Sequence, residues 1–302
     1  MILSTTFGNK RLLAAILVAF LLPVVPQLAF AQEDADIEKI TLSPSSKTVK
    51  ADSGSRVTGT LEVHNTGTVA FDFEVYASPY GVRGENYDPE FTESKPNRDV
   101  YKWVRFSQTD FSIEPGQKRE VNYTLDIPAD ATPGGHYGVI FAETKARAIG
   151  NTGVERQKRV GQVIYATING NYKSEGKLDN FILPFWQTKP PMISSARVTN
   201  TGNVDFETEV KTVAKDMFGR TKYEYTGDPI VLPDTTRLIE MKWEKAPTFG
   251  LFNVSQNIKF LGKEHTNNRL VLVAPRWFPV LVLIVVVSGA GYAVVTRRKN
   301  NR

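Results

Sequence analysis

Apolar and polar residues alternate in many short runs along the middle of the chain, for example from Val69 to Val75 and from Val121 to Leu125. A period of two is typical of a strand with one buried face. Many short strands separated by Gly, Pro and Asn turns favour antiparallel β-sandwiches. The pattern therefore predicts an all-β fold. Further strands are expected at residues 37–42, 101–106, 137–143, 160–168, 192–199, 222–225, 254–260 and 269–273.

An internal duplication divides this β region. Residues 64–75 and 199–210 are identical at seven of twelve positions. In each copy an Asn-Thr-Gly turn joins two alternating runs, and we expect a tight hairpin with Gly67 and Gly202 at positive φ. A repeated unit of this kind predicts two tandem immunoglobulin-like β-sandwich domains, over residues 32–170 and 171–274.

The first copy of the repeat contains an insertion. Gly67 lies 48 positions before the Pro115 turn, whereas Gly202 lies only 31 positions before the Pro233 turn, so the first copy carries about 17 extra residues. They fall in residues 79–98, which lack strand periodicity and are rich in turn formers. Loops of this length in compact domains are usually functional or disordered.

Aromatic and arginine side chains are concentrated in the insertion. Aromatic rings beside arginines suit stacking on sugars or anchoring a protein partner. An alternative is that these rings fold back and cover the edge of the sandwich. The candidate ligand-binding residues are Tyr80, Arg83, Tyr87, Phe91 and Arg98, whereas Trp103 is expected in the core.

Two longer apolar runs lie outside the β region. Residues 12–22 follow two basic residues and precede a small-residue site at 29–31, which predicts a cleaved signal peptide over residues 1–31. Trp277 to Thr296 is a run of 20 uncharged residues, long enough as a helix to cross a hydrocarbon core of about 30 Å. The basic tail, residues 297–302, should stay cytoplasmic. We expect a single-pass cell-membrane protein with its N-terminus extracytoplasmic.

Charge and composition narrow the function classes. The net charge is +5, but two basic residues precede the first apolar run and four follow the second, which leaves 31 basic against 32 acidic residues between them. A nucleic-acid partner is therefore not expected. The chain has no cysteine, so disulfides, thiol catalysis and cysteine-bound metals are excluded. We expect no cofactor and no metal site.

Four segments of the first predicted domain resemble a known family. They are the run Ile-Glu-Pro-Gly-Gln at 113–117, the strand ending Leu-Asp-Ile-Pro at 125–128, Pro-Gly-Gly-His-Tyr-Gly-Val at 133–139 and Arg-Val-Gly-Gln-Val-Ile-Tyr at 159–165. Together with the layout of the chain, they resemble the WxL-interacting proteins of Gram-positive bacterial surfaces. The resemblance covers about residues 35–170. It implies that the first domain binds peptidoglycan and that the second binds another protein or a host ligand.

These observations predict a membrane-anchored extracytoplasmic binding or scaffold protein of the cell envelope, which contacts cell-wall glycan, a surface protein, or both. An alternative is an accessory subunit that pairs with an exported protein partner by strand addition. A third hypothesis is a carbohydrate-active enzyme. The sequence shows no nucleophile elbow, phosphate loop or metal constellation, so we expect no enzymatic activity.

Overall fold

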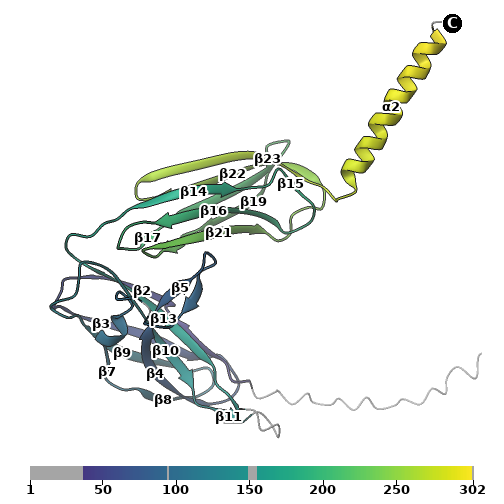
Figure 1. Cartoon of the computed structure of the whole chain (residues 1–302). Helices are drawn as coiled ribbons and strands as arrows, with labels where there is room; N and C mark the ends of the chain where they lie inside the picture. The colour runs from purple at the N-terminus through teal and green to yellow at the C-terminus, as the bar shows by residue number, and fades with distance from the viewer. Residues whose placement is uncertain (1–36, 94, 149–154, 301–302) are drawn as a thin grey trace, which may run out of the picture. The chain divides into compact units, whose positions relative to one another are not determined.

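The computed structural model describes residues 37–93, 95–148 and 155–300, and most of these residues lie in strands (Figure 1). The expectation of a mostly β fold is therefore confirmed. The predicted signal peptide, residues 1–31, lies outside the described residues, as does Arg302 of the predicted tail.

Strands between residues 40 and 168 form two sheets, which we call the first sheet pair. One sheet has the order β1 (Ile40–Ser43), β3 (Arg56–Asn65), β9 (Lys118–Asp126) and β7 (Val104–Phe106). The other has the order β2 (Ser46–Ala51), β13 (Arg159–Ile168), β10 (Gly134–Thr144), β4 (Phe71–Pro79) and β8 (Asp110–Ile113). Only β2 and β13 pair in parallel; the other neighbours are antiparallel. A short β11 (Arg147–Ala148) pairs with β12 (Glu155–Arg156).

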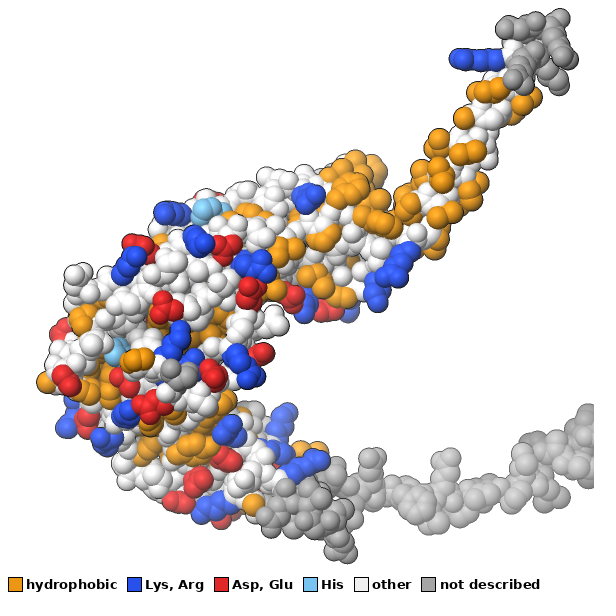
Figure 2. Space-filling view, viewed as in Figure 1, with side chains coloured by type: hydrophobic (Ala, Val, Ile, Leu, Met, Phe, Trp, Pro, Cys, Tyr) orange, Lys and Arg blue, Asp and Glu red, His pale blue; other side chains and the backbone are white. Residues whose placement is uncertain are grey.

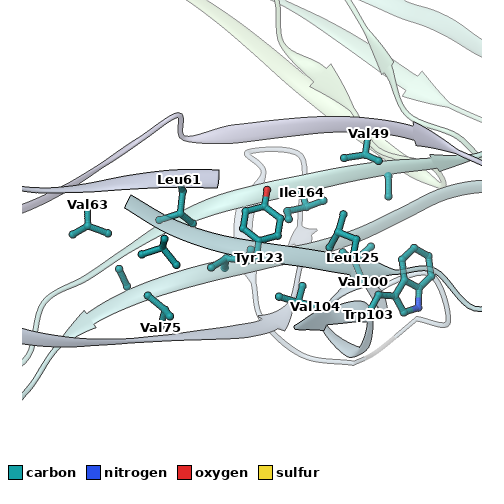
Figure 3. Close-up of a cluster of buried hydrophobic side chains, with 14 of the residues drawn as sticks. Val49, Leu61, Val63, Val75, Val100, Trp103, Val104, Tyr123, Leu125 and Ile164 are labelled. Atoms are coloured by element: carbon teal, nitrogen blue, oxygen red, sulfur yellow. The ribbon is translucent and has the colours of Figure 1, made fainter. Parts of the chain in front are cut away.

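A single hydrophobic core lies between these two sheets (Figure 3). Leu61 of β3 and Leu125 of β9 come from one sheet, and Val75 of β4 and Ile164 of β13 come from the other. Each strand contributes alternate residues, because successive side chains of a strand point to opposite faces. Trp103 is 3% exposed, so its expected place in the core is confirmed.

Strands between residues 176 and 273 form a second sheet pair. One sheet contains β14 (Gly176–Ile182), β16 (Met192–Asn200) and β21 (Thr235–Trp243). The other contains β15 (Trp186–Gln187), β23 (Lys263–Val273), β22 (Gly250–Phe260), β18 (Glu209–Asp216) and β19 (Thr221–Gly227), in that order. A short β17 (Phe206–Glu207) pairs with β20 (Ile230–Val231). Two clusters of buried side chains fill the space between the main sheets.

Both sheet pairs have the immunoglobulin-like arrangement. The first, second and fifth strands of that fold lie on one sheet, and the third, sixth and seventh lie on the other. In the second sheet pair these positions are occupied by β14, β16 and β21, and by β18, β22 and β23. The predicted boundary near residue 170 falls between β13 and β14. The division into two domains stays a prediction.

The repeated Asn-Thr-Gly segment is not a hairpin, and this expectation was wrong. In the first copy it connects β3 to β4, which lie in opposite sheets, and neither Gly67 nor Gly202 has a positive φ. Glycine is required there for another reason: a Cβ atom on Gly67 would overlap the carbonyl oxygen of Ile37, and one on Gly202 would overlap that of Lys173.

A buried asparagine organises this crossover in both copies. The side-chain amide of Asn65 donates to the carbonyl oxygen of Val69 at 2.8 Å, and its oxygen accepts from the backbone N–H of Gly67 at 3.0 Å. Asn200 makes the corresponding bonds to Val204 and Gly202, both at 2.8 Å. The two asparagines are each 1% exposed, so both copies of the repeat contain a buried, hydrogen-bonded asparagine at the same position.

Two other expectations need correction. The strand expected at residues 101–106 begins as a short helix, α1 (Val100–Trp103), and becomes extended only at β7. The inserted residues 79–98, expected to lack strands, contain the antiparallel pair β5 (Gly81–Arg83) and β6 (Asp88–Glu90). The strand β2 was not expected, although Val49 and Ala51 alternate with polar residues in it.

The chain continues from β23 into α2 (Phe278–Asn300). Residues Phe278–Arg297 form a helix long and apolar enough to cross a membrane. This agrees with the apolar helix expected from Trp277 to Thr296. Its side chains are mostly exposed, and Figure 2 shows apolar atoms along its length.

Candidate functional site

The candidate ligand residues lie on or beside the β5–β6 hairpin. Its turn runs from Gly84 to Tyr87, and both of these residues have positive φ, 67° and 62°. Glycine adopts this conformation freely, whereas a bulky residue such as tyrosine does so only when its surroundings hold it there. The surroundings of Tyr87 therefore hold it in this conformation.

Arg98 holds the base of the hairpin. Its guanidinium is buried, and it donates to a carboxylate oxygen of Glu90 at 2.7 Å and to the carbonyl oxygen of Thr92 at 3.2 Å. Gly81 lies directly against this guanidinium, because a Cβ atom there would overlap it. The geometry gives Arg98 a structural role that connects β6 to the following segment.

Tyr80 and Phe91 lie on the outer face of the five-stranded sheet. The ring of Phe91 packs edge-on against Phe141 of β10 at 4.9 Å, and Tyr80 packs against Tyr165 of β13 at 6.2 Å. The guanidinium of Arg159 lies 4.2 Å from the ring centre of Phe141. Both rings are half-buried, so they cover part of the outer face of this sheet, whereas the alternative from the sequence placed them over the edge of the sandwich.

The tip of the hairpin contacts the second sheet pair. The Tyr87 hydroxyl accepts a hydrogen bond from the backbone N–H of Leu232 at 2.9 Å and bonds the Thr235 hydroxyl. The guanidinium of Arg237 lies 4.5 Å from the centre of the Tyr87 ring. Burial raises the pKa of Tyr87 above its ordinary value, so the hydroxyl stays protonated at neutral pH.

Glu85 extends this contact onto the edge of β21. Its carbonyl oxygen accepts from the backbone N–H of Leu238 at 2.8 Å, and its carboxylate accepts from Arg197 Nε at 2.8 Å. β21 is an edge strand, so its outward backbone groups have no neighbouring strand. The hairpin tip pairs with one of these groups and so covers part of the edge.

A second contact lies beside the hairpin. The Tyr137 hydroxyl donates to Asp205 Oδ1 at 2.9 Å, and the backbone N–H of Gly135 donates to the carbonyl oxygen of Asn203 at 2.8 Å. Burial raises the pKa of the Asp205 carboxyl above its ordinary range. Burial likewise raises the pKa of Tyr137. Tyr137 belongs to the segment that carries the family resemblance, and here it joins the two sheet pairs.

Of the five candidate ligand residues, only Arg83 is exposed. The structure gathers the other four into packing and hydrogen bonds, and their ligand-binding role stays a prediction. The two copies of the repeat locate the insertion in the sequence but do not indicate which residues it contacts. They are Arg197, Leu232, Thr235, Arg237 and Leu238. No local pattern marks these residues, because their partners are distant in the chain.

A different feature, the outer edge of β23, is open. In the part of the chain that the structure describes, β15 pairs only with Leu272 and Val273 of this 11-residue strand, and no other strand pairs with that side. The Leu272 N–H points outward, because it donates to the carbonyl oxygen of Phe185 at 2.7 Å. Backbone groups of a strand alternate in direction. Those of Glu264, Thr266, Asn268 and Leu270 therefore also point outward.

Other edges of the second sheet pair are protected. β14 contains a register shift between Leu178 and Asn180, and the β18–β19 pairing shifts between Ala214 and Lys215. The edge of β21 is partly covered by the hairpin. The pairing of β22 with β23 has no register shift, and β23 contains no proline. Bulges, prolines and covering segments are the usual means of blocking an edge, so β23 is the most open edge of this sheet pair.

Within the described residues, no group of three or more His, Asp or Glu side chains has a metal-binding arrangement. Comparison with protein-family models found no match, and comparison with curated proteins found none either.

Comparison with solved structures found several similar folds. The class 5 fimbriae chaperone CfaA is 11% identical, with a TM-score of 0.39, over 77% of this chain and 99% of its own. The Salmonella enterica SafA pilin in complex with the SafB chaperone gives 8% identity and a TM-score of 0.39, over 79% and 98%. A PapD-like domain of human CEP192 is 17% identical, with a TM-score of 0.30, over 48% and 97%. Similarities this low do not indicate a function for this chain.

Proposed function

We propose that this chain is a membrane-anchored binding protein of the cell envelope, and that it binds an exported protein partner by strand addition along β23. The observation that carries the proposal is the open edge of β23 between Lys263 and Val271. In strand addition an extended segment of the partner pairs with a free sheet edge, and its main-chain hydrogen bonds supply affinity. The helix α2 supplies the anchor.

The edge offers enough bonds for a specific complex. The four outward-facing residues of β23 present an N–H and a carbonyl group each. A hydrogen bond contributes a net of about 0.5–1.5 kcal/mol, so a partner strand that satisfies most of these groups gains several kcal/mol. The side chains of Thr266, Asn268 and Leu270 are exposed and would contact alternate side chains of the added strand. Only one outward-facing residue, Glu264, carries a charge.

The membrane anchor makes a modest affinity sufficient. A chain held at the membrane surface meets other envelope proteins at a high effective concentration. In this proposal the C-terminal tail is cytoplasmic, and both sheet pairs lie on the extracytoplasmic side of the membrane. Membership of the WxL-interacting family is part of the same proposal and is supported by the segments at 113–117 and 133–139.

The test uses a photo-crosslinking amino acid at Thr266 of the full-length protein, in cells that express it. A defined adduct with one envelope protein is expected. Lys211 is the matched control, because it is exposed on β18, which has a strand on both sides. The crosslinker at Lys211 should give no adduct.

Two substitutions at Asn268 distinguish binding through backbone hydrogen bonds from binding through side-chain contacts. Asn268→Pro removes an outward N–H without breaking the β22–β23 pairing, whereas Asn268→Ala retains that N–H. We expect the Thr266 adduct to disappear in the proline variant and persist in the alanine variant. An adduct that survives Asn268→Pro, or no adduct in a folded and correctly exported protein, would refute strand addition at this edge.

A further inference from the structure

Large apolar side chains are exposed at one end of the second sheet pair. We call this set the apolar rim; it comprises Phe185, Trp186, Met217, Phe218, Phe249 and Trp277. Their exposed fractions range from 37% for Trp186 to 82% for Phe218. Figure 2 shows apolar side chains gathered over this sheet pair. Single exposed apolar residues are ordinary on protein surfaces, but a contiguous group marks an interaction site.

The strand registers place these residues at the same end. Gly250, which follows Phe249, pairs with Val273 at the end of β23. Asp216, which precedes Met217, pairs with Phe252 near the start of β22. Trp186 pairs with Leu272. The β18–β19 turn, the start of β22 and β15 therefore all lie at the end of the sheet from which the chain leaves for α2.

A short connection ties this end to the helix. Ala274 is fixed to the sheet, because its N–H donates to the carbonyl oxygen of Gln187 at 2.9 Å and its carbonyl accepts from Trp186 Nε1 at 2.8 Å. Only residues 275–277 separate it from Phe278, the first residue of α2. Four residue steps span at most about 14 Å when fully extended, and a turn bond from Phe278 N–H to Pro275 shortens the connection further.

The short connection between Ala274 and Phe278 determines which layer of the membrane the apolar rim can contact. If α2 spans a bilayer, its first residues lie at the boundary of the hydrocarbon core, and the headgroup layer outside that boundary is about 5–7 Å thick. The end of the sheet pair then lies within or beside the headgroup layer. Aromatic side chains are enriched at this depth, because their rings suit its mixed apolar and polar character.

The charges around the apolar rim fit an anionic surface. The guanidinium of Arg220 lies 5.1 Å from the ring centre of Phe218 and binds Asp216 Oδ2 at 2.8 Å, which compensates that carboxylate. Glu244 is a further acidic residue near this end, and Glu240 is paired with Lys242 at 2.9 Å. Exposed basic residues at this end include Lys189, Lys215, Arg220, Lys222, Lys245 and Arg276. Basic side chains beside a membrane helix bind anionic lipid headgroups.

We infer that the apolar rim is a second membrane contact, in which the second sheet pair rests in the headgroup layer of an anionic bilayer. This inference depends on the membrane-spanning role proposed for α2. It goes beyond anchoring, because a helix with a flexible connection leaves the sheet pair free to turn, whereas insertion of Phe218 and Met217 restricts that rotation. The open edge of β23 is then held at a defined height above the membrane.

The absence of native cysteine allows a direct test. Single-cysteine variants of the full-length protein are labelled with an environment-sensitive fluorophore and reconstituted into vesicles of phosphatidylcholine and phosphatidylglycerol. Met217→Cys reports the apolar rim. Leu261→Cys is the matched control, because Leu261 is an exposed apolar residue in the turn at the opposite end of β22 and β23. Val287→Cys reports α2.

Lipids that carry a quencher near the headgroup should reduce the emission at position 217 by about half or more, since interfacial groups lie only about 5–10 Å deep. Emission at position 261 should be unchanged, and deep quenchers should reduce emission at position 287. Quenching at 287 with none at 217 overturns the apolar rim inference and leaves the anchor intact. An absence of quenching at both 217 and 287 overturns the membrane-spanning proposal and the inference together. Equal quenching at 217 and 261 also overturns the inference, because it indicates nonspecific adsorption.

Discussion

The backbone N–H of Leu238 donates to the carbonyl oxygen of Glu85 at 2.8 Å, and this bond joins the hairpin of the first sheet pair to the edge strand β21 of the second. An insertion found by comparing two copies of a repeat thus has a definite structural role. It covers one edge of the second sheet pair, while the outer edge of β23 stays open.

The first prediction concerns Tyr87. Tyr87→Phe should lower the free energy of unfolding by about 1–3 kcal/mol, because the Leu232 N–H loses its acceptor in a largely buried site. Urea unfolding of the full-length protein in detergent measures this change. Tyr101→Phe is the control, since that hydroxyl donates to the exposed Glu93 at the protein surface, and we expect little effect. If Tyr87→Phe has as little effect as we expect of Tyr101→Phe, the hairpin contact contributes no measurable stability.

The second prediction concerns Asn65 and Asn200, the buried asparagines at the same position in the two copies of the repeat. Asn65→Ala and Asn200→Ala should each lower the free energy of unfolding by about 2–3 kcal/mol, because each leaves buried backbone groups unpaired. Asn253→Ala removes an exposed asparagine and should have little effect. Thermal and urea unfolding provide the measurement. A large cost at only one of the two sites would contradict an equivalent role in both copies.

The third prediction concerns pH and His136. Burial lowers the pKa of this imidazole, but its hydrogen bonds to Asp99 and to the carbonyl oxygen of Thr132 outweigh that effect and raise the pKa above 6.5. The folded protein thus holds the proton more tightly than the unfolded chain does. The resulting stabilisation is fully present below pH 6.5 and is lost as the pH rises through the raised pKa.

Unfolding free energies measured across this range should fall with pH in the wild type and fall less in His136→Gln. Asp99→Asn should also flatten the dependence, because it removes the carboxylate that faces the ring. An unchanged slope in both variants would show that another group controls it.

The fourth prediction separates a glycan contact from a structural role in the hairpin. If the hairpin binds peptidoglycan, Arg83→Ala should weaken co-sedimentation of the protein with insoluble peptidoglycan and leave stability unchanged, because Arg83 is exposed. Arg98→Ala should instead lower the free energy of unfolding, because the buried guanidinium bonds Glu90 and Thr92. No saturable co-sedimentation of the folded wild-type protein would exclude the glycan contact.

Much of the secondary structure follows from the sequence alone. Alternation of apolar residues identified β9, β13 and β22, because the period of two is a local property of an extended chain packed on one face. The apolar run before the basic tail identified α2 for an equally local reason. The twelve-residue repeat indicated that one unit occurs twice, and the corresponding bonds of Asn65 and Asn200 reflect this.

Tertiary structure decided the rest. The sequence did not reveal that β3 and β4 lie in opposite sheets, or that Glu85 and Tyr87 contact Leu238 and Leu232. Nor did it indicate which edge stays open. Alternation specifies that a strand has a buried face, but its neighbours and its free edge depend on residues far apart in the chain. These pairings are fixed only in the complete fold. Burial of the whole core determines which backbone groups must find a partner and which remain exposed to solvent.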